Sequence, residues 1–311
     1  MLRTDLALEA REMYQETAGE ITQLQGVKAD TRELDGMTVT TVEILDQKGS
    51  EALGKPVGIY VTIEMPEFKE NGQVFYESAS ATIKDELKKI LPLEKGKTVL
   101  VAGLGNWNIT PDALGPKVVE KLIVTRHLHE LVPHAVGDTL GSVCAVAPGV
   151  LGITGIETSE MIKGVVDLVK PSAVIAIDAL AARKMERVST TIQISNTGIN
   201  PGSGVGNNRK QLSEETLGVP VIAVGVPMVV DAATLAYDAV SAASEKAGNG
   251  QEEEQEKMEL IKDAISSNIG TLMVTPKDVD KIIEQMANIV SAGINITIHD
   301  IELEEISQYI G

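Results

Sequence analysis

From residue 98 onward, short apolar runs alternate with segments of helical periodicity, and this alternation constrains the fold more than any other feature. The apolar runs cover residues 99–102, 143–147, 173–177, 188–195 and 219–224. The segments with a helical pattern are 116–131, 157–169, 179–187 and 231–246. Nearly continuous apolar strands separated by helices are typical of a parallel sheet that is buried on both faces. The sequence therefore predicts an α/β fold with a central, mostly parallel sheet flanked by helices.

The first 95 residues have a different pattern of helices and strands. Helical patterns cover 7–17 and 78–91, strand patterns cover 37–44 and 57–64, and a Gly-Lys-Pro turn lies at 54–56. Near the other end, an acidic stretch at 248–257 is expected to be an exposed loop or the start of a helix, and 276–292 a closing amphipathic helix. We predict a single domain over 6–311, with a smaller N-terminal β-containing lobe at 6–95 and the core sheet with C-terminal helices at 96–311.

Charge and cysteine usage exclude several classes of partner. The formal net charge is −18, and so acidic a surface repels phosphate backbones, so we expect no direct contact with nucleic acid. No apolar run reaches 18 residues, so we expect no membrane segment and a cytoplasmic location. The single cysteine, Cys144, lies in an apolar run and is expected to be an inert hydrophobic residue, with no disulfide and no zinc site.

The loop that follows the first apolar run has two interpretations. It reads VLVAGLGNWNITPDALGP over 99–116, and its Gly103-Leu-Gly105 turn suggests a loop that cradles phosphate. A dinucleotide fingerprint needs a third glycine where this chain has Asn108, and the later glycine cluster at 202–206 lacks the Gly-Lys-Ser/Thr of a phosphate loop. These differences disfavour a nucleotide cofactor, and we predict none.

The other interpretation is a pair of carboxylates. Asp112 and Asp178 each follow an apolar strand, at the edge where open α/β sheets bind their ligands. Each could also be a simple helix-start residue, since Thr110 and Pro111 would begin a helix before Asp112. If the strands are neighbours, the two carboxyl groups can share a proton, so that one activates water and the other protonates a leaving group.

Other catalytic and metal-binding patterns are weaker. His127 and His129 are two positions apart on a helix and do not share a face, and neither His134 nor His299 is an obvious ligand. The chain has no Gly-x-Ser-x-Gly elbow for a serine nucleophile. We interpret Asp138 and Glu157 as ordinary polar residues near loops, and we predict no bound metal.

Several long motifs carry a resemblance to a known family. They include RTDLALEARE (3–12), GLGNWNITPDALGPKVV (103–119), APGVLGITGIETSEMI (147–162), IAIDALAAR (175–183) and TTIQISNTGINPGSGVGNNRK (190–210). In these motifs the chain resembles the germination proteases of bacterial spores, endopeptidases that degrade small acid-soluble spore proteins. The resemblance implies a fold akin to hydrogenase maturation endopeptidases, a homotetramer, and action in the spore core.

The resemblance also implies particular residues. It assigns the catalytic aspartates to Asp112 and Asp178, and it implies a zymogen that removes its own prosegment, here residues 1–5, by cutting between Asp5 and Leu6. Substrates are expected to be cut after Glu or Asp and before a large apolar residue. The acidic residue needs a basic partner, for which the candidates are Arg183, Lys184, Arg187, Arg209 and Lys210.

Two alternatives stay open at this point. A metal-dependent endopeptidase of the same fold would use the two aspartates with a third ligand. A non-catalytic protein would use the same crevice only to bind peptides.

Overall fold

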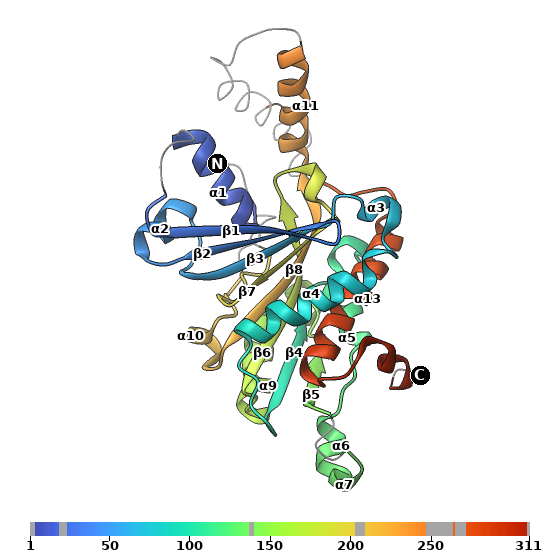
Figure 1. Cartoon of the computed structure of the whole chain (residues 1–311). Coiled ribbons are helices and arrows are strands. Elements are labelled where there is room, and N and C mark those ends of the chain that lie inside the picture. Colours follow the sequence, from blue (N-terminus) through green and yellow to red (C-terminus); the bar gives the residue numbers. More distant parts are fainter. Residues whose placement is uncertain are drawn as a thin grey trace.

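The computed structural model describes residues 4–18, 24–136, 140–202, 209–246, 264 and 272–309. Within these residues the chain forms one mixed sheet, in the order β1-β2-β3-β7-β8-β6-β4-β5, with β9 paired to β8 (Figure 1). The strands are β1 (Val27–Leu34), β2 (Met37–Ile44), β3 (Gly58–Glu64), β4 (Thr98–Gly103), β5 (Ser142–Val146), β6 (Ala173–Ala182), β7 (Thr191–Ser195), β8 (Val221–Asp231) and β9 (Met273–Val274).

The core of the sheet is parallel, as predicted. Strands β5, β4, β6 and β8 pair in parallel, whereas β7 joins β8 in the antiparallel direction and leads through β3 and β2 to β1. The N-terminal strands therefore extend the same sheet outward from its parallel core. The α/β class with a central sheet flanked by helices is confirmed, while the lobe boundary at 95 and 96 stays a prediction.

Helices cover both faces of this sheet. They are α1 (Ala7–Ala18), α2 (Gln47–Leu53), α3 (Phe68–Asn71), α4 (Phe75–Ile90), α5 (Leu114–Glu120), α6 (Arg126–Leu131), α7 (Pro133–Val136), α8 (Leu151–Thr154), α9 (Thr158–Val169), α10 (Glu214–Leu217), α11 (Ala232–Lys246) and α13 (Val279–Ile298), with 3₁₀ turns η1 (Thr110–Asp112), η2 (Met185–Arg187) and η5 (Leu303–Gln308). In Figure 1, α4, α5 and α13 cross one face of the sheet, and their apolar side chains form the larger core with it. A second core, on the opposite face, contains α9 and Leu6.

Most predicted elements are present, and the differences have physical causes. The strand predicted at 37–44 is β2, and the predicted helices at 7–17, 78–91, 157–169, 231–246 and 276–292 correspond to α1, α4, α9, α11 and α13. The single helix predicted over 116–131 is wrong, because it divides into α5 and α6. Between them Ile123 donates its N–H to Asn295 at 3.0 Å, and the Thr125 hydroxyl donates to the Gly141 carbonyl at 2.5 Å.

The helix predicted over 179–187 is also wrong. Strand β6 continues to Ala182 because β8 pairs with it as far as Val230, past an irregularity between Leu180 and Ala181. Two elements are not predicted by the sequence. They are β1, which is mostly exposed and polar, and α2, which ends at Gly54 in the left-handed region. The stretch at 248–257 lies outside the described residues. Among the described residues, none of the helices has the length and apolar character that crossing a membrane requires.

Candidate active site

Asp112 is positioned by a tight return of the chain after β4. Gly105 has a φ of +111°, and a side chain there would meet the Asp112 carbonyl oxygen at 1.9 Å, so the close approach requires glycine. The Asn106 N–H lies 2.9 Å from Asp112 Oδ2 and 3.1 Å from its carbonyl oxygen. Thr110 does not cap this turn, since Ile109 holds the N-cap position without a side-chain hydrogen bond. A backbone N–H of the preceding loop thus holds the Asp112 carboxylate in place.

Asp178 lies inside β6 and is 5% exposed. Its neighbour Ile177 pairs with Gly103, the last residue of β4, so Asp178 lies one position beyond the point where the adjacent strand ends. The carboxylate accepts a hydrogen bond from the Ala179 N–H at 2.9 Å. Asp178 therefore does not begin a helix; it reaches the edge of the parallel sheet on a strand that continues past it.

One cavity brings the two aspartates together. It has a volume of about 320 Å³, and Asp112 and Asp178 both line it. The other charged residues of its wall are Asp5, Glu157 and Arg209. Apolar residues that line it include Leu104, Val150, Leu151 and Leu180. The expectation that both strand ends face one crevice is thus met, and the crevice is large enough for part of a peptide.

The two carboxyl groups have different electrostatic environments, and both have pKa values above the ordinary range. Burial raises the pKa of Asp112 to about 6, although the hydrogen bond from Asn106 opposes this shift. Burial raises the pKa of Asp178 well above its usual range, and the charges of Asp112 and Asp5 raise it further. Both shifts favour the protonated form, and the anionic form is disfavoured most at Asp178, which is the more deeply buried of the two and lies beside two other carboxylates.

The predicted basic residues do not all lie at this site. Arg209 lines the cavity, with Nη1 at 3.6 Å from Glu157 Oε1. Lys210, its neighbour, lies on the surface and pairs with Glu160 at 3.0 Å. Arg183, Lys184 and Arg187 do not line the cavity. Arg209 is therefore the one candidate among the five that the structure brings to the two aspartates.

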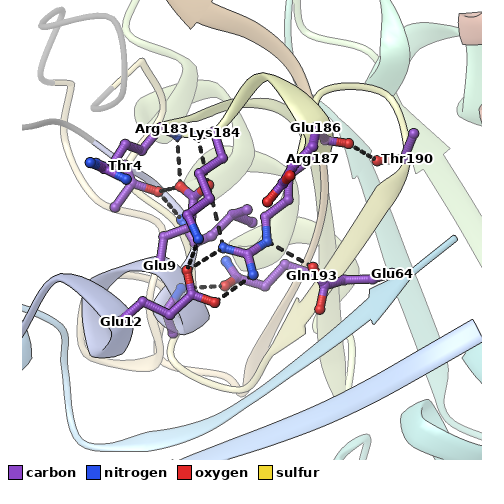
Figure 2. A network of polar contacts seen from close by, with 12 residues as sticks. Thr4, Glu9, Glu12, Glu64, Arg183, Lys184, Glu186, Arg187, Thr190 and Gln193 are labelled. Carbon is purple, nitrogen blue, oxygen red and sulfur yellow. Dashed lines mark hydrogen bonds and ion pairs between the residues drawn. The ribbon is translucent and has the colours of Figure 1, made fainter. Parts of the chain in front are cut away.

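Arg187 instead belongs to a buried network that ties α1 to the sheet (Figure 2). Its Nη1 and Nη2 atoms donate to the carboxylate of Glu12 at 2.7 and 2.6 Å, and its Nε donates to Glu64 at 2.7 Å. Burial lowers the pKa of Arg187, but the hydrogen bonds to Glu12 and Glu64 outweigh it and raise that pKa above its ordinary value. The Glu9 carboxylate accepts the backbone N–H groups of Arg183 and Lys184 at 2.7 and 2.9 Å.

This network predicts a large loss of stability when Arg187 is removed. Arg187→Met leaves the carboxylates of Glu9, Glu12 and Glu64 without their shared cation in a buried place, so the free energy of unfolding should fall by about 3–5 kcal/mol. Urea unfolding monitored by circular dichroism measures it. Lys210→Met, which breaks an exposed pair, is the control and should unfold like the wild type. Equal stability of the two variants would contradict a structural role for Arg187.

The N-terminal segment reaches the same cavity. Asp5 lines it, and the Asp5 carboxylate accepts the Ala181 N–H at 2.9 Å while its own N–H donates to the Ala181 carbonyl at 3.0 Å. Leu6 follows and is fully buried in the core on that face. Of the two residues predicted to flank the self-cleavage site, Asp5 therefore lines the cavity of the carboxyl pair, and Leu6 anchors the chain in the core beside it.

Two features of the site were not predicted from the sequence. Glu157, interpreted as an ordinary polar residue, lines the cavity and faces Arg209. Val150 and Leu151, at the start of α8, supply part of the apolar wall. All three lie in the APGVLGITGIETSEMI motif at 147–162, and the part of this motif in the family resemblance was the available signal. Asp138 lies outside the described residues.

The residues present give little support to a metal at this site. Among the described residues, no group of three or more His, Cys, Asp and Glu side chains is arranged to hold a metal ion. None of the four histidines lines the cavity. In the described part of the chain, the carboxylates that line the cavity with Asp112 and Asp178 are thus not arranged with them as a metal-binding group.

Comparisons with known proteins agree with the resemblance. A family model described as germination protease matches residues 7–249 and 246–310. Germination proteases of Clostridium acetobutylicum and Caldanaerobacter subterraneus are each 49% identical, covering 99% and 96% of this chain and 99% and 94% of their own lengths. The germination protease of Bacillus cytotoxicus is 44% identical over 96% of this chain and 94% of its own. A crystal structure of the [NiFe] hydrogenase maturation protease HycI from Thermococcus kodakarensis matches 67% of this chain and 98% of its own, at 16% identity and a TM-score of 0.33.

Proposed function

This chain belongs to the germination protease family, and from this premise we propose that it hydrolyses peptide bonds with the Asp112–Asp178 carboxyl pair. The observation that carries the proposal is the single cavity that both side chains line, with unequal environments. Two carboxyl groups whose pKa values are pushed apart can divide the roles of general base and general acid.

The difference in environment suggests which group takes which role. Asp112, with a pKa of about 6, is ionised near neutral pH and accepts a proton from the attacking water. Asp178, whose pKa is raised well above its usual range by burial and by the charges of Asp112 and Asp5, holds the proton and donates it to the nitrogen of the leaving amine. The hydrogen bond from the Asn106 N–H fixes the Asp112 carboxylate, as a positioned base requires.

We propose small acid-soluble spore proteins as the substrates, cut after Glu or Asp and before a large apolar residue. This specificity rests on the family resemblance and on the mixed character of the cavity, which has a cation at Arg209 and apolar walls. The resemblance further supports a homotetramer in the spore core, made as a zymogen that cuts itself between Asp5 and Leu6. The position of Asp5 in the cavity supports that cut.

The function is tested by incubating the purified chain with a small acid-soluble spore protein and mapping the cleavage products. We expect cuts after acidic residues, at a rate that exhaustive chelation leaves unchanged. Activity that disappears on chelation and returns with a divalent metal would favour the metal-dependent alternative. Binding of the spore protein without any cleavage would instead favour a peptide-binding protein.

Arg209 should determine the preference for an acidic residue before the cut. Arg209→Gln removes the cation from the cavity wall, so kcat/KM for a peptide with Glu at that position should fall by about 10- to 100-fold. The matched peptide with Gln should be cut at a nearly unchanged rate. Lys210→Gln, one residue further along on the surface, is the control. An unchanged Glu-to-Gln preference in Arg209→Gln would refute this assignment.

A further inference from the structure

The carbonyl oxygen of Asp5 is bound by two side chains that the mechanism above does not use. Lys55 Nζ donates to it at 3.0 Å, and Gln193 Nε2 donates to it at 3.0 Å. Lys55 Nζ also donates to the carbonyl oxygen of Thr4 at 3.1 Å. A carbonyl that accepts both an ammonium and a carboxamide is polarised, and this carbonyl belongs to the Asp5–Leu6 peptide bond.

We propose that Lys55 and Gln193 bind the carbonyl oxygen of the peptide bond to be cut and stabilise the negative charge that develops on it. The inference rests on the proposed peptidase function, and it adds two catalytic residues to the carboxyl pair. It applies first to the chain's own Asp5–Leu6 bond, and then to a substrate that takes the same place after residues 1–5 have left.

The fold holds both donors in place. Lys55 follows Gly54, which ends α2 in the left-handed region, so the turn after that helix directs the chain toward Asp5. Gln193 lies in β7 and is 8% exposed. Its Oε1 atom accepts the Ala7 N–H at 2.7 Å, which leaves its amide nitrogen to donate to Asp5. Gln193 therefore binds the main chain on both sides of Leu6.

This carbonyl site adjoins the carboxyl pair. A second cavity, of about 80 Å³, is lined by Lys55 and Gln193, and it shares Asp5 and Leu180 with the cavity of the two aspartates. Asp5 thus lies between the donors and the catalytic carboxyl groups. Burial lowers the pKa of Lys55 below its ordinary value, and the charges of Asp5 and Glu9 offset only part of that shift.

The chemistry gives these donors a defined role. Water bonds to the carbonyl carbon while Asp112 takes a water proton, and the electron pair of the C=O double bond moves onto oxygen. Lys55 and Gln193 donate to that oxygen while it is negative. The double bond then re-forms, the C–N bond breaks, and the Asp178 proton passes to the leaving nitrogen. Donors about 2.7–3.1 Å from the developing oxyanion stabilise such states, and losing one costs about 10²–10³ in kcat.

The experiment uses the full chain and two reactions. The first is release of residues 1–5, followed by sequencing the new N-terminus; the second is cleavage of the peptide RTDLALEARE, with kcat and KM measured separately. In Lys55→Met we expect both kcat and the rate of self-cleavage to fall by about 10²–10³, with KM changed less than threefold. Lys55→Arg, which keeps a charged donor, should recover kcat to within tenfold of the wild type.

Lys184→Met is the matched control, because Lys184 contacts Glu12 of α1 at 3.0 Å and does not touch the Asp5 carbonyl. A residue that only anchors the N-terminal segment would affect stability, so Lys184→Met should leave kcat unchanged.

Gln193→Met provides a second test if Lys55→Met fails to fold, and its kcat should fall by the same mechanism. Folded variants of Lys55 and Gln193 with the wild-type kcat would overturn the inference while leaving the proposed function intact. A wild-type chain that cuts neither itself nor the peptide would refute the proposed function and, with it, the inference.

Discussion

Replacing Asp112 or Asp178 by asparagine should reduce peptide cleavage by about 10²–10⁴-fold while the chain stays folded. Asparagine has nearly the same shape as aspartate, and at position 112 its amide oxygen can still accept the hydrogen bond that the Asn106 N–H now donates. What is lost is the ability to take or give a proton. Because the two groups act as one unit, the double variant should be little slower than either single variant.

The measurement is kcat/KM on a spore-protein peptide, with circular dichroism to establish folding. Asp300→Asn is the control, since Asp300 pairs with Lys88 on the surface and has a φ of +51°, a conformation that asparagine tolerates. It should retain full activity. Wild-type cleavage rates in a folded Asp112→Asn or Asp178→Asn variant would show that the carboxyl pair is not the catalytic centre.

The carboxyl pair could be found from sequence because one rule placed both residues. Each follows an apolar run, and adjacent parallel strands bring such positions to one edge of a sheet. The rule does not need the correct local structure after the strand. Asp178 lies inside β6 and not before the helix predicted over 179–187, yet it still reaches the predicted edge, because its position relative to the end of β4 is what counts.

The surroundings of the pair could not be found in this way. Arg187 and Arg209 look alike in the sequence, as basic residues on segments expected to flank the strand ends. Only tertiary packing shows that Arg187 is enclosed by carboxylates from α1 and β3, while Arg209 faces the cavity. Lys55 is separated by 50 residues in the chain from the carbonyl it contacts, and no local periodicity encodes a contact of that kind.

The extent of β6 was missed for a related reason. Residues 179–182 read Ala-Leu-Ala-Ala, which has a strong helical propensity. Pairing with β8 overrides that propensity, because the backbone groups of this buried segment find their partners across the sheet. The longer strand matters for the site, since its final residues include Ala181, which binds Asp5 through both backbone groups.

Peptidase activity should show a bell-shaped dependence on pH, with its acid limb near pH 6. Below that pH, Asp112 becomes protonated and can no longer accept a proton from water, so kcat/KM should fall about tenfold per pH unit. On the alkaline side, activity should decline when Asp178 ionises, at a pH well above the ordinary range for a carboxyl group. Initial rates on a peptide substrate from pH 5 upward measure the acid limb first and then the decline on the alkaline side. A profile that is flat over this range would contradict the division of roles, and Asp300→Asn should reproduce the wild-type curve.

Protein stability gives a check on the same groups that does not depend on activity. A carboxyl group whose pKa is raised in the folded state binds more protons there than in the unfolded chain, so its contribution to stability decreases as the pH rises. For Asp112 the decrease should run from about pH 4, the ordinary range for a carboxyl group, to about 6, and for Asp178 it should continue to higher pH. The melting temperature of Asp178→Asn, which carries no charge to bury, should therefore exceed that of the wild type at pH 8 and approach it at pH 4. A variant that is less stable than the wild type at pH 8 would mean that the buried carboxylate at position 178 is stabilised by its surroundings, and the assignment of Asp178 as the proton donor would fail.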